Sequence, residues 1–382
     1  MKKILLIISI PLFIGLVYGV IQYLALGSDL IIGGTTEVPG QSETVPYEIV
    51  EVARGLDVPW SIVFTSPTRI LITERSGAIR IIQDGVLAEK PIMTFPEVSS
   101  TDEEGLMSLT LDPDYEDNKY IYTSYAYRGK NGMAVRVVRL TDRGDSLADA
   151  RIIIDDIPAA KYHAGSRLAF GPDGKLYIST GDATNKSLAQ DKRSLAGKIL
   201  RINADGSIPG DNPEAGSPVW SYGHRNPQGL AWLGDDLYSS EHGPSVFDGP
   251  AGGDEVNKIV KGGNYGWPLV SHLKTRDGTV APLRVFTPAE APASLMAYSG
   301  KMFPQYRDYL FFWALKGEGI IVLALNNEKL DLVGKIATEY GRIREVVEAP
   351  DGSIYFSTSN RDGRGTLQAG DDKIYRIQRA GR

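Results

Sequence analysis

The chain contains no cysteine and only four histidines among its 382 residues. The absence of cysteine excludes disulfide bonds, thiolate metal sites and thiol nucleophiles. Basic side chains number 41 against 47 acidic ones, and the resulting net charge of −6 argues against a nucleic-acid surface as the main partner. With 42% hydrophobic and 23% charged residues, the composition is that of a globular protein with a large core.

An apolar run at the N-terminus is long enough to span a bilayer. Lys2 and Lys3 precede an uncharged stretch from Ile4 to Leu26. The two lysines favour a cytoplasmic N-terminus and export of the rest of the chain, and the length of the run favours an uncleaved anchor. Ala25-Leu26-Gly27 resembles a small-x-small cleavage site, so a cleaved signal peptide is the alternative.

Composition divides the chain into three parts. Residues 28–46 are rich in Gly, Ser, Thr, Pro and Glu and offer little that could join a core, as expected for a flexible linker. We therefore expect a signal anchor or signal peptide over residues 1–27, the linker over 28–46 and the folded domain over 47–382. The folded domain is expected to be extracytoplasmic, membrane-anchored if the N-terminal segment is retained and secreted if it is cleaved.

Beyond the linker, strand and turn signals dominate and one unit recurs. It consists of an apolar run, a turn, and a strand that ends in small or polar residues. In its clearest copy the turn is Pro172-Asp173-Gly174. The six copies pair residues 62–64 with 70–73, 109–113 with 120–123, 167–170 with 176–180, 230–232 with 237–240, 302–304 with 310–313, and 347–352 with 354–357.

Six copies at intervals of roughly 45 to 70 residues predict an all-β fold, a six-bladed β-propeller of four-stranded antiparallel blades. A β-sandwich and an elongated β-solenoid are the alternatives, but a sandwich does not explain six similar units. In a propeller the loops on one face open over the central channel, so each blade can contribute a polar group to a shared site there.

His163 and Asp182 are expected at the same end of the third unit. His163 precedes its first apolar run and Asp182 follows its second strand, so antiparallel pairing brings them together. A carboxylate beside an imidazole orients a general base and raises its basicity. The alternative is a structural histidine, the commoner role of a single histidine. His224 and His242 lack the i,i+4 spacing of a helical zinc site.

Two loops near the fourth unit carry further candidates. Arg225 offers a rigid fork of donors and Asn226 an amide, which suit a planar, oxygen-rich ligand; a polar loop entering a strand is the alternative. After Gly243 and Pro244, a loop over residues 245–254 can turn backbone carbonyls inward toward a hard cation such as Ca²⁺. A flexible surface insertion is the other explanation of that loop.

Basic residues occur at corresponding places in the last two units. Lys316 closes the strand of the fifth unit, and alternation places Arg342 and Arg344 on one face of the segment that enters the sixth. Surface arginines are usually just solvated, but gathered at one channel mouth these cations would suit an anion with several carboxylates. The glycine-rich segment 262–268 lacks the lysine and spacing of a phosphate loop and is interpreted as a tight chain crossing.

Four segments are specific in combination: GHRNPQGLAW from Gly223, EHGP from Glu241, GGDEVNKIVKGGNYGWP from Gly252, and RIRE from Arg342 with the PDG turn that follows. Together they resemble the soluble aldose sugar dehydrogenases that use pyrroloquinoline quinone (PQQ), including the six-bladed quinoprotein glucose dehydrogenase. The resemblance covers residues 47–377.

The resemblance implies roles for residues of the third and fourth units. His163 matches the family's general base, which removes the proton of the sugar's anomeric hydroxyl while hydride passes to the quinone. Asp182 matches the carboxylate that orients this base. Arg225 and Asn226 match groups that hold the quinone oxygens, and Arg225 would stabilise the negative charge that develops there.

The resemblance also implies how the cofactor and its metal are held. Gly243 and Pro244 match the pair whose backbone carbonyls bind the cofactor's Ca²⁺, which acts on the quinone as a Lewis acid. Glu255 and Tyr265 resemble positions that help bind a second, structural Ca²⁺. The residues that match the basic grip on the cofactor carboxylates are Lys316, Arg342 and Arg344.

The sequence departs from the family's pattern in places. Glu103, which we count with the cofactor site, stands where the glucose dehydrogenase has a glutamine near base and substrate. A carboxylate there would alter sugar preference or act on the His163 proton. Residues 289–294 align poorly with the family's cofactor-contacting threonine. The glucose enzyme's long dimer insertions are absent, which leaves the oligomeric state open and suggests a wide groove with broad aldose specificity.

These observations predict an exported, membrane-anchored quinoprotein that oxidises aldoses at C1 to lactones and passes two electrons through PQQ to an external quinone, cytochrome or dye. A Ca²⁺-dependent propeller lactonase or hydrolase is one alternative, although the channel candidates are mainly His, Arg and Lys. A propeller that binds a glycan or a protein without catalysis is another. No glycine fingerprint follows a strand and opens a helix, so neither a nicotinamide nor a flavin site is expected.

Overall fold

The computed structural model describes residues 46–380. The first strand, β1 (Tyr47–Arg54), begins where the folded domain was expected to begin. The predicted segment 1–27 and the predicted linker 28–46 lie outside the described residues, apart from Pro46. Among the described residues, no helix combines the length and hydrophobicity needed to cross a membrane.

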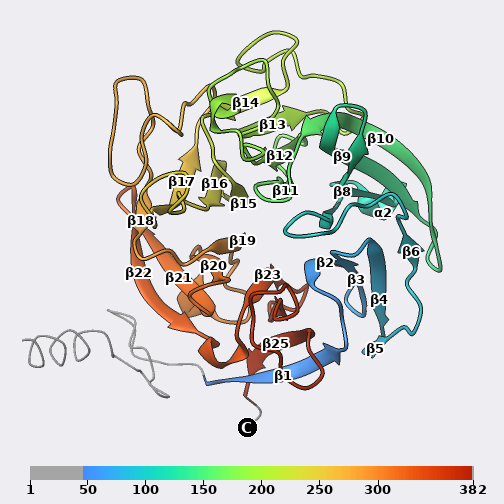
Figure 1. Ribbon diagram of the computed structural model, residues 1–382. Helices are drawn as coiled ribbons and strands as arrows, with labels where there is room; N and C mark the ends of the chain where they lie inside the picture. Colours follow the sequence, from blue (N-terminus) through green and yellow to red (C-terminus); the bar gives the residue numbers. More distant parts are fainter. Residues whose placement is uncertain (1–45, 381–382) are drawn as a thin grey trace, which may run out of the picture. The chain divides into compact units, whose positions relative to one another are not determined.

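Six antiparallel sheets surround a common centre (Figure 1). Five have four strands, as predicted, and the first has five because β5 and β6 both pair with β4. The first three sheets contain β2 (Pro59–Ser66), β3 (Arg69–Glu74), β4 (Ala78–Gln83), β5 (Val86–Leu87) and β6 (Met93–Thr94); β7 (Leu106–Leu111), β8 (Tyr120–Gly129), β9 (Gly132–Asp142) and β10 (Leu147–Pro158); and β11 (Gly165–Phe170), β12 (Leu176–Thr180), β13 (Lys198–Ile202) and β14 (Val219–Tyr222).

The last three sheets complete the ring. They contain β15 (Pro227–Leu233), β16 (Asp236–Glu241), β17 (Asp254–Ile259) and β18 (Arg284–Phe286); β19 (Pro292–Ala297), β20 (Leu310–Ala314), β21 (Gly319–Asn326) and β22 (Lys329–Ile336); and β23 (Ile343–Glu348), β24 (Ile354–Thr358) and β25 (Lys373–Arg379) with β1. The described helices are single turns in connections: α2 (Tyr115–Asn118), η1 (Lys186–Ala189), η2 (Pro304–Tyr306) and η3 (Thr338–Tyr340).

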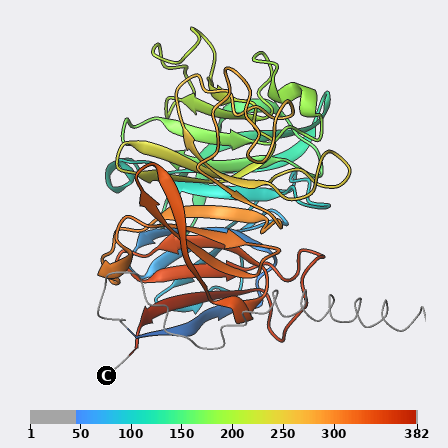
Figure 2. The same cartoon turned by 90° about the vertical axis from the view of Figure 1, so that its left-hand side faces the viewer.

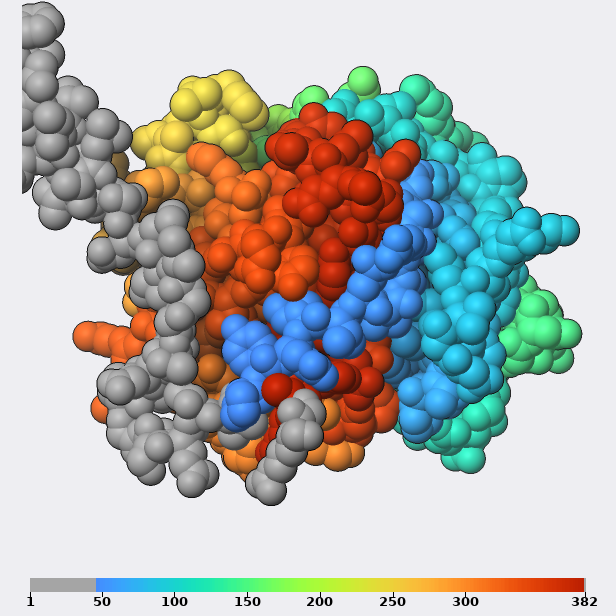
Figure 3. Space-filling view, turned by 90° about the horizontal axis from the view of Figure 1, so that it is seen from below, coloured from blue at the N-terminus to red at the C-terminus, as the bar shows by residue number. Residues whose placement is uncertain are grey.

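The first strands of the sheets form a closed inner ring. β2, β7, β11, β15, β19 and β23 each contact the first strand of the sheet on either side. β1 pairs with β25, from Tyr47 opposite Arg379 to Arg54 opposite Lys373, and Figure 3 shows this blue strand against the red C-terminal part. The two ends of the folded domain therefore close the sixth blade, and the predicted six-bladed propeller is confirmed.

The core lies between the blades. Buried apolar side chains fall into six clusters, one at each interface between neighbouring sheets, and Figure 2 shows such sheets stacked face to face. Because both faces of a blade are covered, its middle strands are apolar without strict alternation. All five residues of β12 and all five of β20 are buried.

Hydroxyl groups on second strands explain the small or polar ends of the repeats. Each donates a hydrogen bond to a backbone carbonyl on the inner strand of the next blade. The bonds join Thr73 to Met107 (2.6 Å), Ser124 to Ser166 (2.8 Å), Ser179 to Pro227 (2.8 Å), Ser240 to Ala293 (3.5 Å) and Ser357 to Pro59 (3.1 Å). In the fifth blade, β20 lacks a hydroxyl, and the backbone N–H of Val346 donates to Ser294 Oγ at 2.8 Å instead.

The predicted first run of the fifth unit is wrong. Residues 302–304 are not a strand; β19 takes that place and pairs with β20, with Ala297 opposite Leu310. The apolar run instead leads into η2, and Phe303 is buried in the same cluster as Tyr298. Residues 302–304 are apolar because they pack beneath a connection. A short apolar run of this kind cannot be told from a strand by its sequence alone.

An ion pair crosses the centre of the ring. Arg167 on β11, in the third blade, donates to Glu345 on β23, in the sixth, at 2.5 Å. Arg167 Nε also donates to the carbonyl of Gln228 at 3.0 Å, and its guanidinium lies over the Trp60 ring, 4.3 Å from the centroid. Side chains from three blades and a backbone carbonyl from another thus meet in the channel.

Arg167→Met is expected to lower the free energy of unfolding by about 3–5 kcal/mol, because it leaves the Glu345 carboxylate buried without its partner. Urea unfolding followed by circular dichroism measures the loss. The double variant Arg167→Met with Glu345→Leu removes the uncompensated charge and is expected to recover most of it. A single variant within about 0.5 kcal/mol of the wild type would show that another group neutralises Glu345.

Candidate active site

The predicted hairpin of the third blade carries the predicted pair. β11 and β12 place Gly165 opposite Thr180, and His163 Nδ1 lies 2.8 Å from Asp182 Oδ1. The His163 backbone is left-handed, with φ of 57°, and it packs against Gly181, where a Cβ would lie 1.9 Å from the His163 carbonyl oxygen. Glycine at 181 is therefore required for the approach that sets the imidazole beside the carboxylate.

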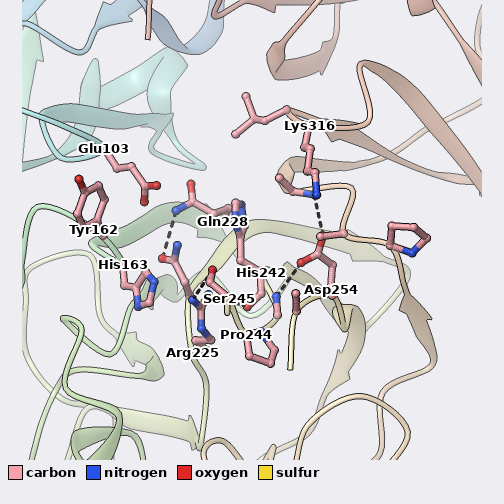
Figure 4. A pocket seen from close by; sticks show the side chains of 18 of the residues that line it. Glu103, Tyr162, His163, Arg225, Gln228, His242, Pro244, Ser245, Asp254 and Lys316 are labelled. Atoms are coloured by element: carbon pink, nitrogen blue, oxygen red, sulfur yellow. Dashed lines mark hydrogen bonds between the residues drawn. The ribbon is translucent and has the colours of Figure 1, made fainter. Parts of the chain in front are cut away.

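Both oxygens of Asp182 have hydrogen-bond donors. Oδ1 also accepts from the backbone N–H of Thr184 at 2.9 Å, and Oδ2 accepts from Trp267 Nε1 at 2.8 Å. A buried carboxylate in this position accepts the Nδ1 proton of His163, which leaves Nε2 as the basic nitrogen. His163 lines a cavity (Figure 4), whereas Asp182 is buried and does not line it. The pair therefore has the geometry of an oriented base.

A cavity of about 950 Å³ adjoins His163, at the upper end of the ~300–1,000 Å³ typical of small-molecule sites. Connections from several blades form its walls, as expected for a propeller. The predicted site residues that line it are Glu103, His163, Arg225, Asn226, Gly243, Pro244, Lys316, Arg342 and Arg344. The structure thus brings together the predicted base, donors, basic residues and carbonyl pair.

Arg225 joins the cavity wall to the long loop 245–254. Its Nε donates to Asp248 Oδ2 at 2.9 Å, and its backbone N–H donates to the Glu241 carboxylate. Beside it, Asn226 Oδ1 accepts from the backbone N–H of Gly165 at 3.2 Å. The ion pair with Arg225 thus holds the loop 245–254. The neighbouring residue, Asn226, contacts the hairpin that carries His163.

Two basic side chains of the sixth blade share a single carboxylate. Arg342 donates to Asp362 from Nε at 3.0 Å and from Nη2 at 2.7 Å, and Arg344 Nη2 lies 3.8 Å from the same group. Burial lowers the pKa of Arg344 to about 10, and its Nε has no hydrogen-bond partner among residues 46–380. Lys316 forms no ion pair with any described residue, so the cavity keeps excess positive charge here.

Gly243 and Pro244 line the cavity on a backbone held from both sides. The Gly243 N–H donates to Asp254 Oδ1 at 2.8 Å, and Asp254 Oδ2 accepts from the backbone of Ala291 at 2.7 Å. A Cβ at Gly243 would lie 2.2 Å from the carbonyl oxygen of Gly252. The close approach of the two backbones therefore depends on glycine.

Glu255 and Tyr265 do not line the main cavity. With Glu241 they line a neighbouring one of about 10 Å³, roughly the space of one water-sized sphere. Glu241 and Glu255 are register partners on β16 and β17; burial, and then the charge of Glu241, raise the pKa of Glu255 to about 8. The Tyr265 hydroxyl donates to the Lys258 carbonyl at 2.5 Å. Within residues 46–380, no three Asp, Glu, His or Cys side chains are grouped as a metal site.

Two further histidines lie near the site in different settings. His224 is fully buried, with Nδ1 2.9 Å from Glu241 and Nε2 2.9 Å from Ser221, which makes it part of a structural network. His242 lines the main cavity, burial lowers its pKa, and its Nε2 has no partner in the described part of the chain.

Several residues that complete the site were not predicted from the sequence: Trp267, Asp248, Asp362 and Arg364. Segment 262–268 does cross the chain, as Tyr222 bridges Asn264, but the crossing also delivers Trp267 to Asp182. For Asp248, Asp362 and Arg364 the sequence shows only that charged residues occur in loops. It does not show which side chains they bind, because the fold decides that. Arg364, for example, donates to Glu103 at 2.7 Å across 261 positions.

The family model of glucose/sorbosone dehydrogenases matches residues 56–374, most of the chain. The chain belongs to the glucose/sorbosone dehydrogenase family. It is 36% identical over 348 residues to the aldose sugar dehydrogenase YliI of Escherichia coli, covering 84% of this chain and 91% of that protein. It is 32% identical over 261 residues to quinoprotein glucose dehydrogenase B of Acinetobacter calcoaceticus, covering 59% of this chain and 53% of that protein.

Among solved structures, the PQQ-bound form of the aldose sugar dehydrogenase from Streptomyces coelicolor superposes with a TM-score of 0.78. That chain is 32% identical, and the match covers 88% of this chain and 99% of that one. The apo-form of the soluble aldose sugar dehydrogenase from Escherichia coli gives a TM-score of 0.77 at 31% identity, and the match covers 87% of this chain and 100% of that one. The resemblance identified from the motifs is confirmed, and the family is one of oxidoreductases.

Trp267→Phe is expected to destabilise the protein by about 1–3 kcal/mol, because one oxygen of the buried Asp182 carboxylate loses its donor. Trp313→Phe is the matched control, since Trp313 is also buried but its Nε1 has no partner among the described residues. Both variants remove the same atoms, so a larger loss of unfolding free energy in urea for Trp267→Phe reports the hydrogen bond together with the contact of Arg225 with the Trp267 ring. Equal losses would contradict the anchoring role of Trp267.

Proposed function

We propose that this family member oxidises aldoses at C1 to lactones, using PQQ and Ca²⁺. Family membership and the PQQ-bound aldose sugar dehydrogenase neighbour support an oxidoreductase that acts on sugars. The observation that carries the proposal is the buried Arg344 guanidinium, which has an Nε without a partner among the described residues and lines a large cavity. A buried cation with an unused donor is stabilised by an anionic ligand.

The donor set of the cavity fits a planar quinone that carries carboxylates. Lys316, Arg342 and Arg344 would hold the carboxylates, while Arg225 and Asn226 would donate to the quinone oxygens. When bound, PQQ supplies the oxidising power by accepting a hydride.

His163 would supply the base in this reaction. Because Nδ1 donates to Asp182, Nε2 is the nitrogen left to act as the base. His163 lines the cavity, so Nε2 would accept the proton of the anomeric hydroxyl there. Asp182 would stabilise the imidazolium that results, without taking the proton itself. Its second oxygen, bound to Trp267, fixes the carboxylate and therefore the ring that depends on it.

Gly243 and Pro244 would bind the cofactor's Ca²⁺ through their backbone carbonyls. The glycine-dependent packing of this segment at the cavity wall supports that role. Glu255 would bind a second, structural Ca²⁺ together with Glu241, because two buried carboxylates in register favour a cation between them. Tyr265 would contribute its backbone carbonyl, since its hydroxyl is engaged.

Two alternatives are less well supported. A Ca²⁺-dependent propeller hydrolase would use carboxylates and amides around its metal, whereas Lys316, Arg342 and Arg344 line this cavity. A propeller that only binds a glycan or protein does not require the oriented pair of His163 and Asp182.

We also propose export through residues 1–27, retention of this segment as a membrane anchor, and electron transfer to an external acceptor.

The purified full chain, incubated with PQQ and Ca²⁺, is expected to reduce an artificial dye in the presence of glucose. The wide cavity leads us to expect comparable turnover on several hexoses, pentoses and disaccharides. Absorbance of the retained quinone provides a second readout. A protein that neither retains the quinone nor reduces the dye would remove the proposal, and strict selectivity for one sugar would remove its broad-specificity part.

His163→Ala is expected to lower kcat by the roughly 10²- to 10⁴-fold of a lost general base, while the affinity for PQQ stays close to that of the wild type. Steady-state kinetics measure the first quantity and an absorbance titration the second. Loss of PQQ binding in His163→Ala would assign this residue to the cofactor site instead.

Ca²⁺ at a hundred times its Kd is expected to stabilise the fold by about 2.7 kcal/mol per site, and removal of Ca²⁺ with EDTA to reverse the gain. Glu255→Gln should lose the share that comes from the structural site. Glu214→Gln is the control, because Glu214 is exposed and lines neither cavity. Thermal unfolding with and without Ca²⁺ measures the effect; an unchanged gain in Glu255→Gln would exclude Glu255 as a ligand.

A further inference from the structure

The rim of the cavity beside His163 carries a charged bridge between two loops. Arg364 Nη1 donates to Glu103 Oε1 at 2.7 Å, and both side chains line the cavity. The Arg364 guanidinium also lies over the ring of Tyr162, 5.7 Å from its centroid. Figure 4 shows Glu103, Tyr162 and His163 on one side of the cavity, away from Lys316.

Backbone hydrogen bonds hold both ends of the bridge. The Glu103 N–H donates to the Lys161 carbonyl at 3.0 Å, which ties it to the segment of the general base. The Arg364 N–H donates to Asp362 Oδ1 at 3.0 Å, and this carboxylate also pairs with Arg342. The bridge therefore connects the proton-accepting side of the cavity to its basic side.

The Glu103 carboxylate has one oxygen available to a ligand. Oε1 accepts from Arg364, whereas Oε2 has no donor among residues 46–380. Burial alone would raise the pKa of Glu103, but its interactions with His242, then Arg364 and His163, lower it below the usual value. An ionised carboxylate only accepts hydrogen bonds, and sugar hydroxyls can donate them. The adjacent Tyr162 ring adds an apolar face with a polar edge.

We propose that Arg364 is a positioning residue for the sugar. It holds Glu103 so that the free carboxylate oxygen accepts a hydrogen bond from a sugar hydroxyl beside His163, and Tyr162 forms the adjoining wall. The inference rests on the proposed function and deepens it. The chemistry selects an uncharged, polyhydroxylated substrate, because an acidic sugar would bring a second carboxylate toward Glu103.

Arg364→Ala in the full chain, loaded with PQQ and Ca²⁺, is expected to raise the KM for glucose about tenfold or more, the effect of one charge-assisted hydrogen bond, with kcat within about threefold of the wild type. Arg364→Lys keeps the charge but not the planar fork, so its KM should lie between that of the wild type and that of Arg364→Ala. Arg361→Ala is the matched control: it lies in the same loop, its side chain is 50% exposed against 51% for Arg364, and it does not line the cavity.

Glu103→Gln and the double variant complete the test. Because Arg364 acts through Glu103, the double variant is expected to have the KM of Glu103→Gln alone. Additive effects, or an unchanged KM in Arg364→Ala, would overturn the inference. A loss of PQQ affinity or of Tm in Arg364→Ala would also overturn it, by assigning the residue to the cofactor or to the fold.

Failure of the proposed function would look different. In that case the wild type itself would oxidise no aldose, and the inference would fall with it. An active wild type whose KM does not respond to Arg364→Ala rejects the inference alone.

Discussion

The fold depends on one constraint: each blade is apolar on both faces and must be covered by two neighbours. A row of such sheets has uncovered faces at its ends, whereas a closed ring has none. The six hydrophobic clusters, one at each interface, show the constraint satisfied. The pairing of β1 with β25 secures the closure by joining the two ends of the folded domain. Since the ring fixes every blade, connections at its rim can carry chemistry without carrying the fold.

Charges inside the ring are balanced in two different ways. In the channel, Arg167 and Glu345 form a one-to-one pair at 2.5 Å, which suits a structural element. At the cavity, Arg342 and Arg344 share one carboxylate, Asp362, at 2.7 and 3.8 Å. The second arrangement leaves positive charge uncompensated in a partly desolvated place, which costs stability unless an anion enters. The imbalance therefore distinguishes a binding site from a structural ion pair.

Sequence periodicity was sufficient for the fold because the repeated unit has a local cause. In five of the six blades the second strand carries a hydroxyl that bonds the next blade, as Ser179 does with Pro227, so the pattern recurs with the blade. It failed at residues 302–304, where packing below a connection imitated a strand. The pair His163 and Asp182 was predictable because one hairpin places both. Trp267 and Arg364 were not, because their partners, Asp182 and Glu103, lie 85 and 261 positions away and meet them only in the folded ring. Asp248 and Asp362 were not predictable either, because they lie in loops, where no strand register fixes which side chains meet.

The completed and incomplete parts of the site have different physical roles. His163 and Trp267 are both hydrogen-bonded to the Asp182 carboxylate, so the orientation of the imidazole is set by folding. Arg344 keeps an unused donor within the described structure, so its interactions are completed only by a ligand. Preorganised groups lower the barrier of a reaction because they need no rearrangement during it, whereas unsatisfied groups contribute affinity. The hairpin is thus suited to proton transfer, and the basic residues of the fifth and sixth blades to binding an anion.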